Sequence, residues 1–250
     1  MVLIFGLYAS SVLIITSPQL FQVCMGARRL DKLAEVQKIA TEKYPESPGT
    51  LIFKQCDVTQ RESVCDLVKE AEDNLGDVDI LINCAGVMFF TEMKNGLVDQ
   101  WEKTVDVNCK GVLHGIGAVL PKLVSRGKGK ILTISSDAAM RPFRTLAVYC
   151  ASKKFVETLC EVTRQELVGT GVTLHTICPG DVKGTELIMK NTDTSAAEKM
   201  GVEIGKKVGE GFTRNQLLDT DDVANAVIYA LTAPPHVAIN TILVEPRDQE

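Results

Sequence analysis

Four polar residues in the middle of the chain have types and spacings that suit proton transfer. Tyr149 and Lys153 are four residues apart, so on a helix their side chains share one face. Ser136 and Asn108 precede them at the end of an apolar run and inside a helical pattern. A phenol and an ammonium group at one site could serve as acid and base for the reduction of a carbonyl or the oxidation of an alcohol.

This chemistry requires a site from which water is partly excluded. A free tyrosine has a pKa of about 10, and lowering it by ~3 units takes roughly 4 kcal/mol. An ammonium about 4–5 Å away supplies ~3–4 kcal/mol at an effective dielectric near 20, but about 1 kcal/mol in bulk water. Lys153 is therefore sufficient only in a desolvated site. Taken singly, Ser136 and Asn108 would not indicate a catalytic site, because a serine at a strand end and a polar residue on a helix are both common.

The segments that hold these residues alternate between strand and helix patterns. Short apolar runs predict strands at 21–25, 51–53, 78–82, 130–134, 172–177 and 239–244. Apolar residues at steps of three and four predict helices at 30–40, 64–75, 98–124, 146–168 and 221–231. Residues 180–215 are polar and glycine-rich, and no element is predicted there. Alternation with short connections predicts a single α/β domain over residues 1–250, a doubly wound, Rossmann-like parallel sheet.

Polar residues follow five of the predicted strands, where such sheets bind their ligands. These strand ends read Arg28-Arg29, Asp57-Val58, Asn83-Cys84-Ala85-Gly86, Ser135-Ser136 and Pro179-Gly180. An acid normally ends the second strand and binds a ribose 2′-hydroxyl. Two guanidinium groups are there instead, and they suit a 2′-phosphate. The alternative is a pair of solvated arginines at the start of a helix that binds no ligand. The cofactor predicted from this end is NADP.

These motifs together resemble the short-chain dehydrogenase/reductase family over residues 21–250. The elements that carry the resemblance are Asn83-Cys84-Ala85-Gly86, similar to its Asn-Asn-Ala-Gly; Val107-Asn108; Ile134-Ser135-Ser136; and the Tyr-x-x-x-Lys of Tyr149–Lys153. Two further segments, 179–185 and 239–246, look most like the branch of NADP-dependent 3-hydroxy acid dehydrogenases and their animal relatives.

The resemblance implies an oxidoreductase that interconverts a small alcohol or hydroxy acid and the carbonyl compound. It implies Tyr149 as the acid and base, Lys153 as the cation that lowers its pKa and holds the ribose, Ser136 as the group that orients the substrate oxygen, and Asn108 as the carrier of a relay water. The residues that it implies for NADP are Arg28, Arg29, Asp57, Val58, Asn83, Ala85, Gly86, Tyr149, Lys153, Pro179, Gly180, Val182 and Thr185.

The resemblance also implies a homodimer or homotetramer. The segments 98–124 and 146–168 support this because they carry apolar residues on more than one face, among them Val105, Val107, Val112 and Leu113. A helix that is apolar nearly all round needs cover on both sides.

The N-terminal segment, residues 1–22, departs from the family pattern. Residues 1–27 contain no Asp, Glu, Lys or Arg, and their only glycines are Gly6 and Gly26. The family places a glycine-rich turn here, whose backbone amides bind the pyrophosphate. We therefore expect an atypical or disrupted first βα unit and weakened NADP binding. Three alternatives stay open: an active enzyme, a non-catalytic binding or scaffold protein, and an enzyme anchored in a membrane by this segment.

A membrane span is the less favoured interpretation of the apolar stretch 2–15. Polar residues interrupt the first 20 positions, and no cationic residue precedes the apolar run as in a signal peptide. Buried parallel strands have the same hydropathy. A buried strand followed by more core is the preferred prediction.

Composition limits the remaining functions. Of 250 residues, 45% are hydrophobic and 24% charged, the proportions of a soluble globular protein. The net charge of -5 and the lack of a long basic run argue against nucleic-acid binding. Eight cysteines without a Cys-x-x-Cys pair and three scattered histidines predict no metal site and a reducing, cytoplasmic location.

Overall fold

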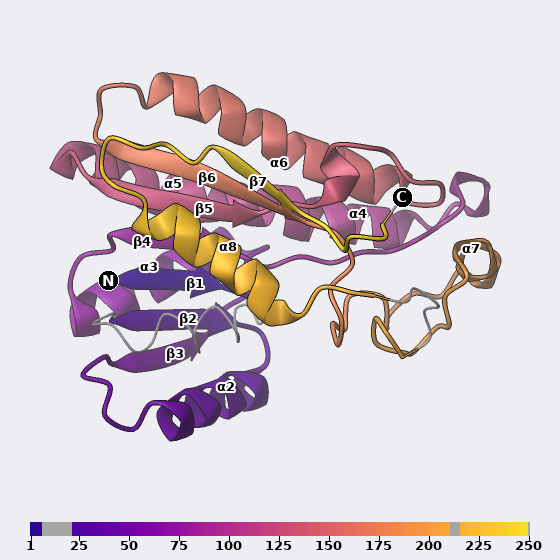
Figure 1. The fold of residues 1–250 in the computed structure, drawn as a ribbon, viewed down its shortest axis with the longest axis horizontal. Helices are drawn as coiled ribbons and strands as arrows, with labels where there is room; N and C mark the ends of the chain where they lie inside the picture. Colours follow the sequence, from indigo (N-terminus) through magenta and orange to yellow (C-terminus); the bar gives the residue numbers. More distant parts are fainter. Residues whose placement is uncertain (7–21, 211–215, 250) are drawn as a thin grey trace.

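Seven parallel strands form one sheet in the order β3-β2-β1-β4-β5-β6-β7 (Figure 1). The computed structural model describes residues 1–6, 22–210 and 216–249. The strands are β1 Val2–Phe5, β2 Val23–Ala27, β3 Leu51–Gln55, β4 Ile80–Asn83, β5 Gly129–Ile134, β6 Val172–Pro179 and β7 Thr241–Val244. The predicted doubly wound α/β fold is confirmed, and the order reverses between β1 and β4, where such sheets open a crevice for ligands.

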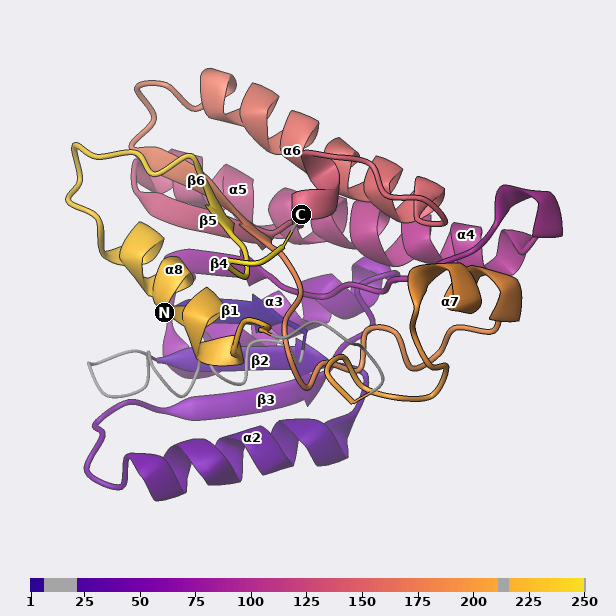
Figure 2. The ribbon, with the colours of Figure 1, turned by 45° about the vertical axis from the view of Figure 1, so that its right-hand side comes forward.

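Helices cover both faces of the sheet (Figure 2). Those described are α2 Leu30–Lys43, α3 Arg61–Leu75, α4 Val98–Val105, α5 Gly111–Arg126, α6 Ala147–Glu166, α7 Thr194–Met200 and α8 Thr220–Thr232. The core packed by α2 and α8 lies on one face, and the core packed by α3, α5 and α6 lies on the other. Each layer buries its apolar stripe against the strands, the arrangement expected for a parallel sheet.

The apolar start of the chain includes a central strand of this sheet. Val2 and Ile4 pack on the face with α2 and α8, while Leu3 and Phe5 pack on the opposite face. Alternate side chains of a strand point to opposite faces, so a strand covered on both sides is apolar throughout. The first strand of the βα unit is therefore present. The rest of the atypical segment, residues 7–21, lies outside the described residues. Among the residues that the structure does describe, no helix is long and apolar enough to cross a membrane.

Two segments differ from the sequence prediction. The helix predicted at 98–124 consists of α4 and α5 joined by a π-helical turn at Asp106–Lys110. The region 180–215, for which no element is predicted, contains the seven-residue helix α7. Asp193 caps it by accepting a hydrogen bond from the Ala196 backbone N–H at 3.1 Å. Such a short helix offers too few turns for a periodic pattern to stand out.

Candidate active site and cofactor cleft

Tyr149 and Lys153 lie on the first turns of α6, and both are 6% exposed. Their spacing places the Lys153 Nζ 5.7 Å from the centroid of the Tyr149 ring. The same ammonium donates a hydrogen bond to the Ile134 carbonyl at 3.0 Å, which joins α6 to the carboxyl end of β5. The phenol and the ammonium that the sequence predicts at one site are thus brought together.

Ser136 lies two residues after the end of β5, near the phenol. Its side chain accepts a hydrogen bond from the Ala138 N–H at 3.2 Å and donates one to Asp137 Oδ1 at 2.9 Å. The same hydroxyl lies near the Tyr149 phenol and acts to lower the pKa of that group.

Burial dominates the electrostatics of the phenol. It raises the pKa of Tyr149 well above its ordinary value. The hydrogen bond from Ser136 opposes this shift, and the charges of Asp137, Cys150 and Asp181 add to it. The neutral phenol is therefore the resting form at neutral pH, and it is the form that can donate a proton.

Lys153 remains a cation at neutral pH despite its burial. Desolvation lowers its pKa to about 8, and the nearby Cys84, Cys178, Cys109 and Glu157 oppose that shift. The ammonium is held by its hydrogen bond to the Ile134 carbonyl. The groups that shift the pKa of Tyr149, besides burial, are Ser136, Asp137, Cys150 and Asp181. A phenolate formed during turnover would be the group that this cation stabilises.

Asn108 lies in the π-helical turn between α4 and α5 and is 1% exposed. Its amide exchanges two hydrogen bonds of 2.9 Å with the backbone of Val87 and donates a third to Ser152 Oγ at 3.0 Å. A Cβ placed on Gly86 would lie 3.6 Å from Asn108 Oδ1 and 3.8 Å from Lys153 Nζ. Asn108 therefore connects the loop after β4 to α6 by hydrogen bonds. Gly86 has no side chain to fill the space beside Asn108 and Lys153.

A cavity of about 530 Å³ opens beside these residues, along the carboxyl ends of β1, β2 and β4. Of the predicted cofactor residues, those that line it are Arg28, Arg29, Asp57, Val58, Ala85, Gly86 and Thr185. Three lysines also line it, Lys32, Lys103 and Lys190, so basic side chains outnumber the carboxylates of Glu35, Asp57 and Glu186. Such a lining suits a ligand that carries several phosphates.

Six predicted cofactor residues are not part of this lining: Tyr149 and Lys153, described above on α6, and Asn83, Pro179, Gly180 and Val182. Asn83 donates to Thr133 Oγ1 at 3.3 Å, and a Cβ on Gly115 would approach Asn83 Oδ1 to 2.4 Å, so this side chain faces α5. Pro179 ends β6, Gly180 donates its N–H to the Val244 carbonyl at 2.8 Å, and Val182 forms a bridge with Leu218. None of these four is part of the described cavity lining.

Two residues of the site, Glu186 and Asp137, were not predicted from the sequence. Arg29 Nη2 lies 2.7 Å from Glu186 Oε2. The guanidinium that was expected to bind the 2′-phosphate is therefore ion-paired with a carboxylate. Asp137 contacts Ser136 directly. The position of Asp137 next to Ser136 was the one sequence feature that could have pointed to it. The sequence around Glu186 has no feature that predicts its pairing with Arg29.

The cavity residues fit an NADP molecule. The Thr185 hydroxyl is buried and has no hydrogen-bond partner among the described residues, and it belongs to the cavity lining. An unpaired buried hydroxyl is costly, and a polar ligand in the cavity would satisfy it.

Gly6 has a φ of +108°, and a Cβ there would lie 2.7 Å from the Ala85 nitrogen, so only glycine allows β1 to end this close to the loop after β4.

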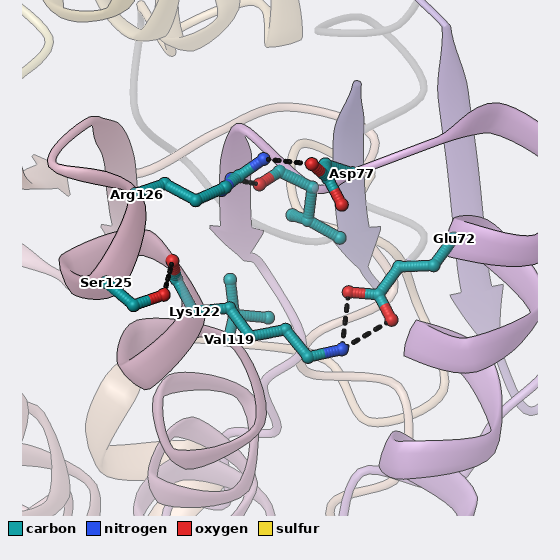
Figure 3. Close-up of a pocket in the computed structure, with 7 residues that line it drawn as sticks. Glu72, Asp77, Val119, Lys122, Ser125 and Arg126 are labelled. Carbon is teal, nitrogen blue, oxygen red and sulfur yellow. Dashed lines mark hydrogen bonds and ion pairs between the residues drawn. The ribbon is translucent and has the colours of Figure 1, made fainter.

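A second, smaller cavity lies between α3 and α5 (Figure 3). Lys122 Nζ is 2.8 and 2.6 Å from the two carboxylate oxygens of Glu72, and Arg126 pairs with Asp77 at 3.1 Å. Val78, which precedes β4, also lines it, so it lies at the amino ends of the strands. Its charged groups already pair with one another, and it is best explained as an ion-paired helix contact.

Comparison with known proteins identifies the class. Residues 18–196 match the family described as short chain dehydrogenase, and the chain belongs to this family of oxidoreductases. The resemblance predicted from the sequence is confirmed.

Individual relatives share most of this chain. A glycine betaine reductase of Emericella nidulans is 45% identical over 227 residues, which cover 91% of this chain and 17% of that protein. This chain thus spans about a sixth of that relative. An uncharacterized oxidoreductase of Staphylococcus saprophyticus is 34% identical over 225 residues, covering 90% of this chain and 86% of the relative.

Solved structures agree in fold. The closed form of serine dehydrogenase complexed with NADP+ has a TM-score of 0.84 and 28% identity, covering 100% of this chain and 96% of that one. Serine dehydrogenase from Escherichia coli has a TM-score of 0.80 and 27% identity, covering 100% and 99%.

Proposed function

We propose that the protein is an NADP(H)-dependent oxidoreductase that interconverts a small alcohol or hydroxy acid and the corresponding carbonyl compound. The observation that carries this proposal is the placement of Tyr149, Ser136 and the Lys153 ammonium together at the carboxyl end of β5, next to a basic cavity. The serine dehydrogenase bound to NADP+ and the glycine betaine reductase among the relatives support this reaction class.

Tyr149 acts as the acid in reduction and as the base in oxidation. When bound, NADP(H) supplies or accepts the hydride. In reduction, the Tyr149 O–H gives its proton to the substrate oxygen, which becomes a hydroxyl, and the phenolate is neutralised from solvent. In oxidation, the alcohol O–H gives its proton to the phenolate. Lys153 stabilises that phenolate, Ser136 hydrogen-bonds the reacting oxygen, and Asn108 fixes the loop and holds a relay water.

The cofactor assignment extends along the cavity. Arg28 and Arg29 would hold the 2′-phosphate, and Asp57 and Val58 would flank the adenine. Ala85 and Gly86 would lie by the adenosine ribose, Lys153 and Tyr149 would hold the nicotinamide ribose, and the Thr185 hydroxyl would bind the nicotinamide end. The backbone of Pro179, Gly180 and Val182 would shape that end, while Asn83 would act only by supporting β4.

The assembly and location follow from the surface and the thiols. Exposed apolar residues on α4, α5 and α6 include Val105, Leu113 and Val162, which are 41%, 43% and 47% exposed. These helices are the proposed interface of a homodimer or homotetramer. All eight cysteines are free, which suits a reducing compartment, and we place the protein in the cytoplasm.

The test is NADPH oxidation at 340 nm with a panel of small aldehydes, ketones and keto acids, run beside NADH. Turnover with NADPH that vanishes in Tyr149→Phe supports the proposal. Tight NADPH binding without turnover on any member of the panel would favour the binding or scaffold alternative.

A further inference from the structure

Asp137 is a buried carboxylate at the reacting end of the site, with 6% of its surface exposed. Its Oδ1 accepts hydrogen bonds from the Ser136 hydroxyl at 2.9 Å and from the Ala138 N–H at 2.8 Å. Its Oδ2 accepts from the side-chain amide of Gln249 and lies 3.9 Å from Arg141 Nη2. The carboxylate is thus held in one position beside the serine.

Negative charge predominates around this carboxylate. Asp181 follows β6, and its backbone N–H donates at 3.1 Å to the same Gln249 side chain that contacts Asp137. The charges of Asp137 and Asp181 both reach the Tyr149 phenol. Arg141, the nearby guanidinium, is paired with Glu245 as well as with Asp137. The carboxylates that act on the phenol are therefore Asp137 and Asp181, and the guanidinium near Asp137 is shared with Glu245.

The side chains packed around Tyr149 are apolar. Tyr149 packs in a cluster with Phe90, Leu146 and Ile188, against which the partly buried Met88, Phe143 and Met200 are packed. Aromatic rings and thioethers tolerate a methylated ammonium, which is cationic yet carries a carbon surface. They give a free carboxylate nothing to pair with.

Resting on the proposed function, we propose that Asp137 determines the substrate class: an alcohol or carbonyl compound that bears an ammonium group, in preference to a hydroxy acid. A fixed negative charge beside the reacting oxygen attracts a cationic substrate and repels a carboxylate. The basic cavity next to it has the opposite sign, so the two ends separate a phosphate-bearing cofactor from a cationic substrate.

Asp137 also acts through Ser136 as a positioning residue. It accepts the hydrogen bond of the Ser136 hydroxyl, so the serine oxygen is oriented to accept a hydrogen bond from a substrate hydroxyl. The groups that face the phenol are Ser136, Asp137, Cys150, Asp181 and Lys153. Removing the Asp137 charge therefore makes the phenolate easier to form.

The experiment compares three alcohols of similar size in NADP-dependent oxidation: (2-hydroxyethyl)trimethylammonium, its neutral isostere 3,3-dimethylbutan-1-ol, and 3-hydroxybutyrate. The wild-type protein should prefer the ammonium alcohol to the neutral isostere by at least about tenfold in kcat/KM, with 3-hydroxybutyrate slowest. Asp137→Asn keeps an acceptor for Ser136 and removes the charge, so the ratio should fall to about one. Asp73→Asn, an exposed carboxylate on α3, is the matched control and should leave the ratio unchanged.

A pH profile separates positioning from a merely structural role. With the neutral isostere, Asp137→Asn should shift the pKa of kcat/KM downward, whereas Asp73→Asn should not. Turnover with equal rates on the ammonium and neutral alcohols, or fastest turnover of 3-hydroxybutyrate, would overturn the inference and leave the oxidoreductase proposal intact. No turnover of any alcohol or carbonyl compound, with the cofactor bound, would overturn both.

Discussion

The Arg29 guanidinium gives a quantitative prediction for cofactor choice. Replacing it, as Arg29→Leu, removes a charge-assisted contact to a 2′-phosphate, which is worth about 1.5–3 kcal/mol. The Arg29–Glu186 pair must open for that contact, and both side chains are about half exposed to solvent, 46% and 38%. An exposed pair contributes roughly 0.2–1 kcal/mol. The net loss is therefore about 0.5–2.8 kcal/mol, or a roughly 2- to 100-fold weaker Kd for NADPH.

Fluorescence titrations with NADPH and NADH, each on wild type and variant, measure this effect. The Kd for NADH should change less than about twofold, since NADH has no 2′-phosphate for Arg29 to hold. Glu186→Gln is the matched variant. Arg29 holds the pKa of Glu186 below its ordinary value, so the carboxylate competes throughout the neutral range. Its removal should tighten NADPH binding by up to about fivefold. An equal loss of NADPH and NADH affinity in Arg29→Leu would refute the reasoning.

Three further predictions concern the lysine, the assembly and the N-terminal segment. Lys153→Met should lower both kcat and NADPH affinity. Burial lowers the Lys153 pKa to about 8, so the charged form is lost as pH rises through that value, and wild-type NADPH affinity should fall above it while the variant stays flat. Light scattering at micromolar concentration should give a dimer or tetramer mass, and a monomer mass would contradict the proposed helix interface. Replacing residues 1–22 with a strand and a glycine-rich turn should tighten NADPH binding by about 10²–10⁴, since each regained charge-assisted hydrogen bond is worth roughly 1.5–3 kcal/mol. Equal low-micromolar affinity in both proteins would show that the native segment already binds the pyrophosphate.

The strands were predictable because a parallel sheet buried on both faces needs continuous apolar runs. The runs at 51–53 and 172–177 lie within β3 Leu51–Gln55 and β6 Val172–Pro179. Tyr149 and Lys153 could be paired because helical spacing alone brings them to one face. The orientation of Asn83 could not be assigned without the register. It is paired with Phe5 across β1 and β4 and faces away from the cavity, as its hydrogen bond to Thr133 shows.

Contacts between distant segments account for what the sequence did not predict. Asp137 gains its fixed position largely from Gln249, and Arg29 meets Glu186 across the cavity. No local pattern encodes such pairs, because they depend on how the loops after separate strands come together at one edge of the sheet.

Hydride transfer coupled to protonation by Tyr149 is the central claim, and isotope transfer tests it most directly. The best carbonyl substrate of the panel is reduced with NADPH deuterated at the transferred position, and the alcohol is analysed by mass spectrometry. The wild-type protein should place one deuterium on the carbinol carbon for each NADPH consumed. Tyr149→Phe should retain the fold and NADPH affinity while losing about 10²–10⁴ in rate, the contribution of general acid catalysis. Retention of a tenth or more of the wild-type kcat, or an alcohol without deuterium, would contradict the account.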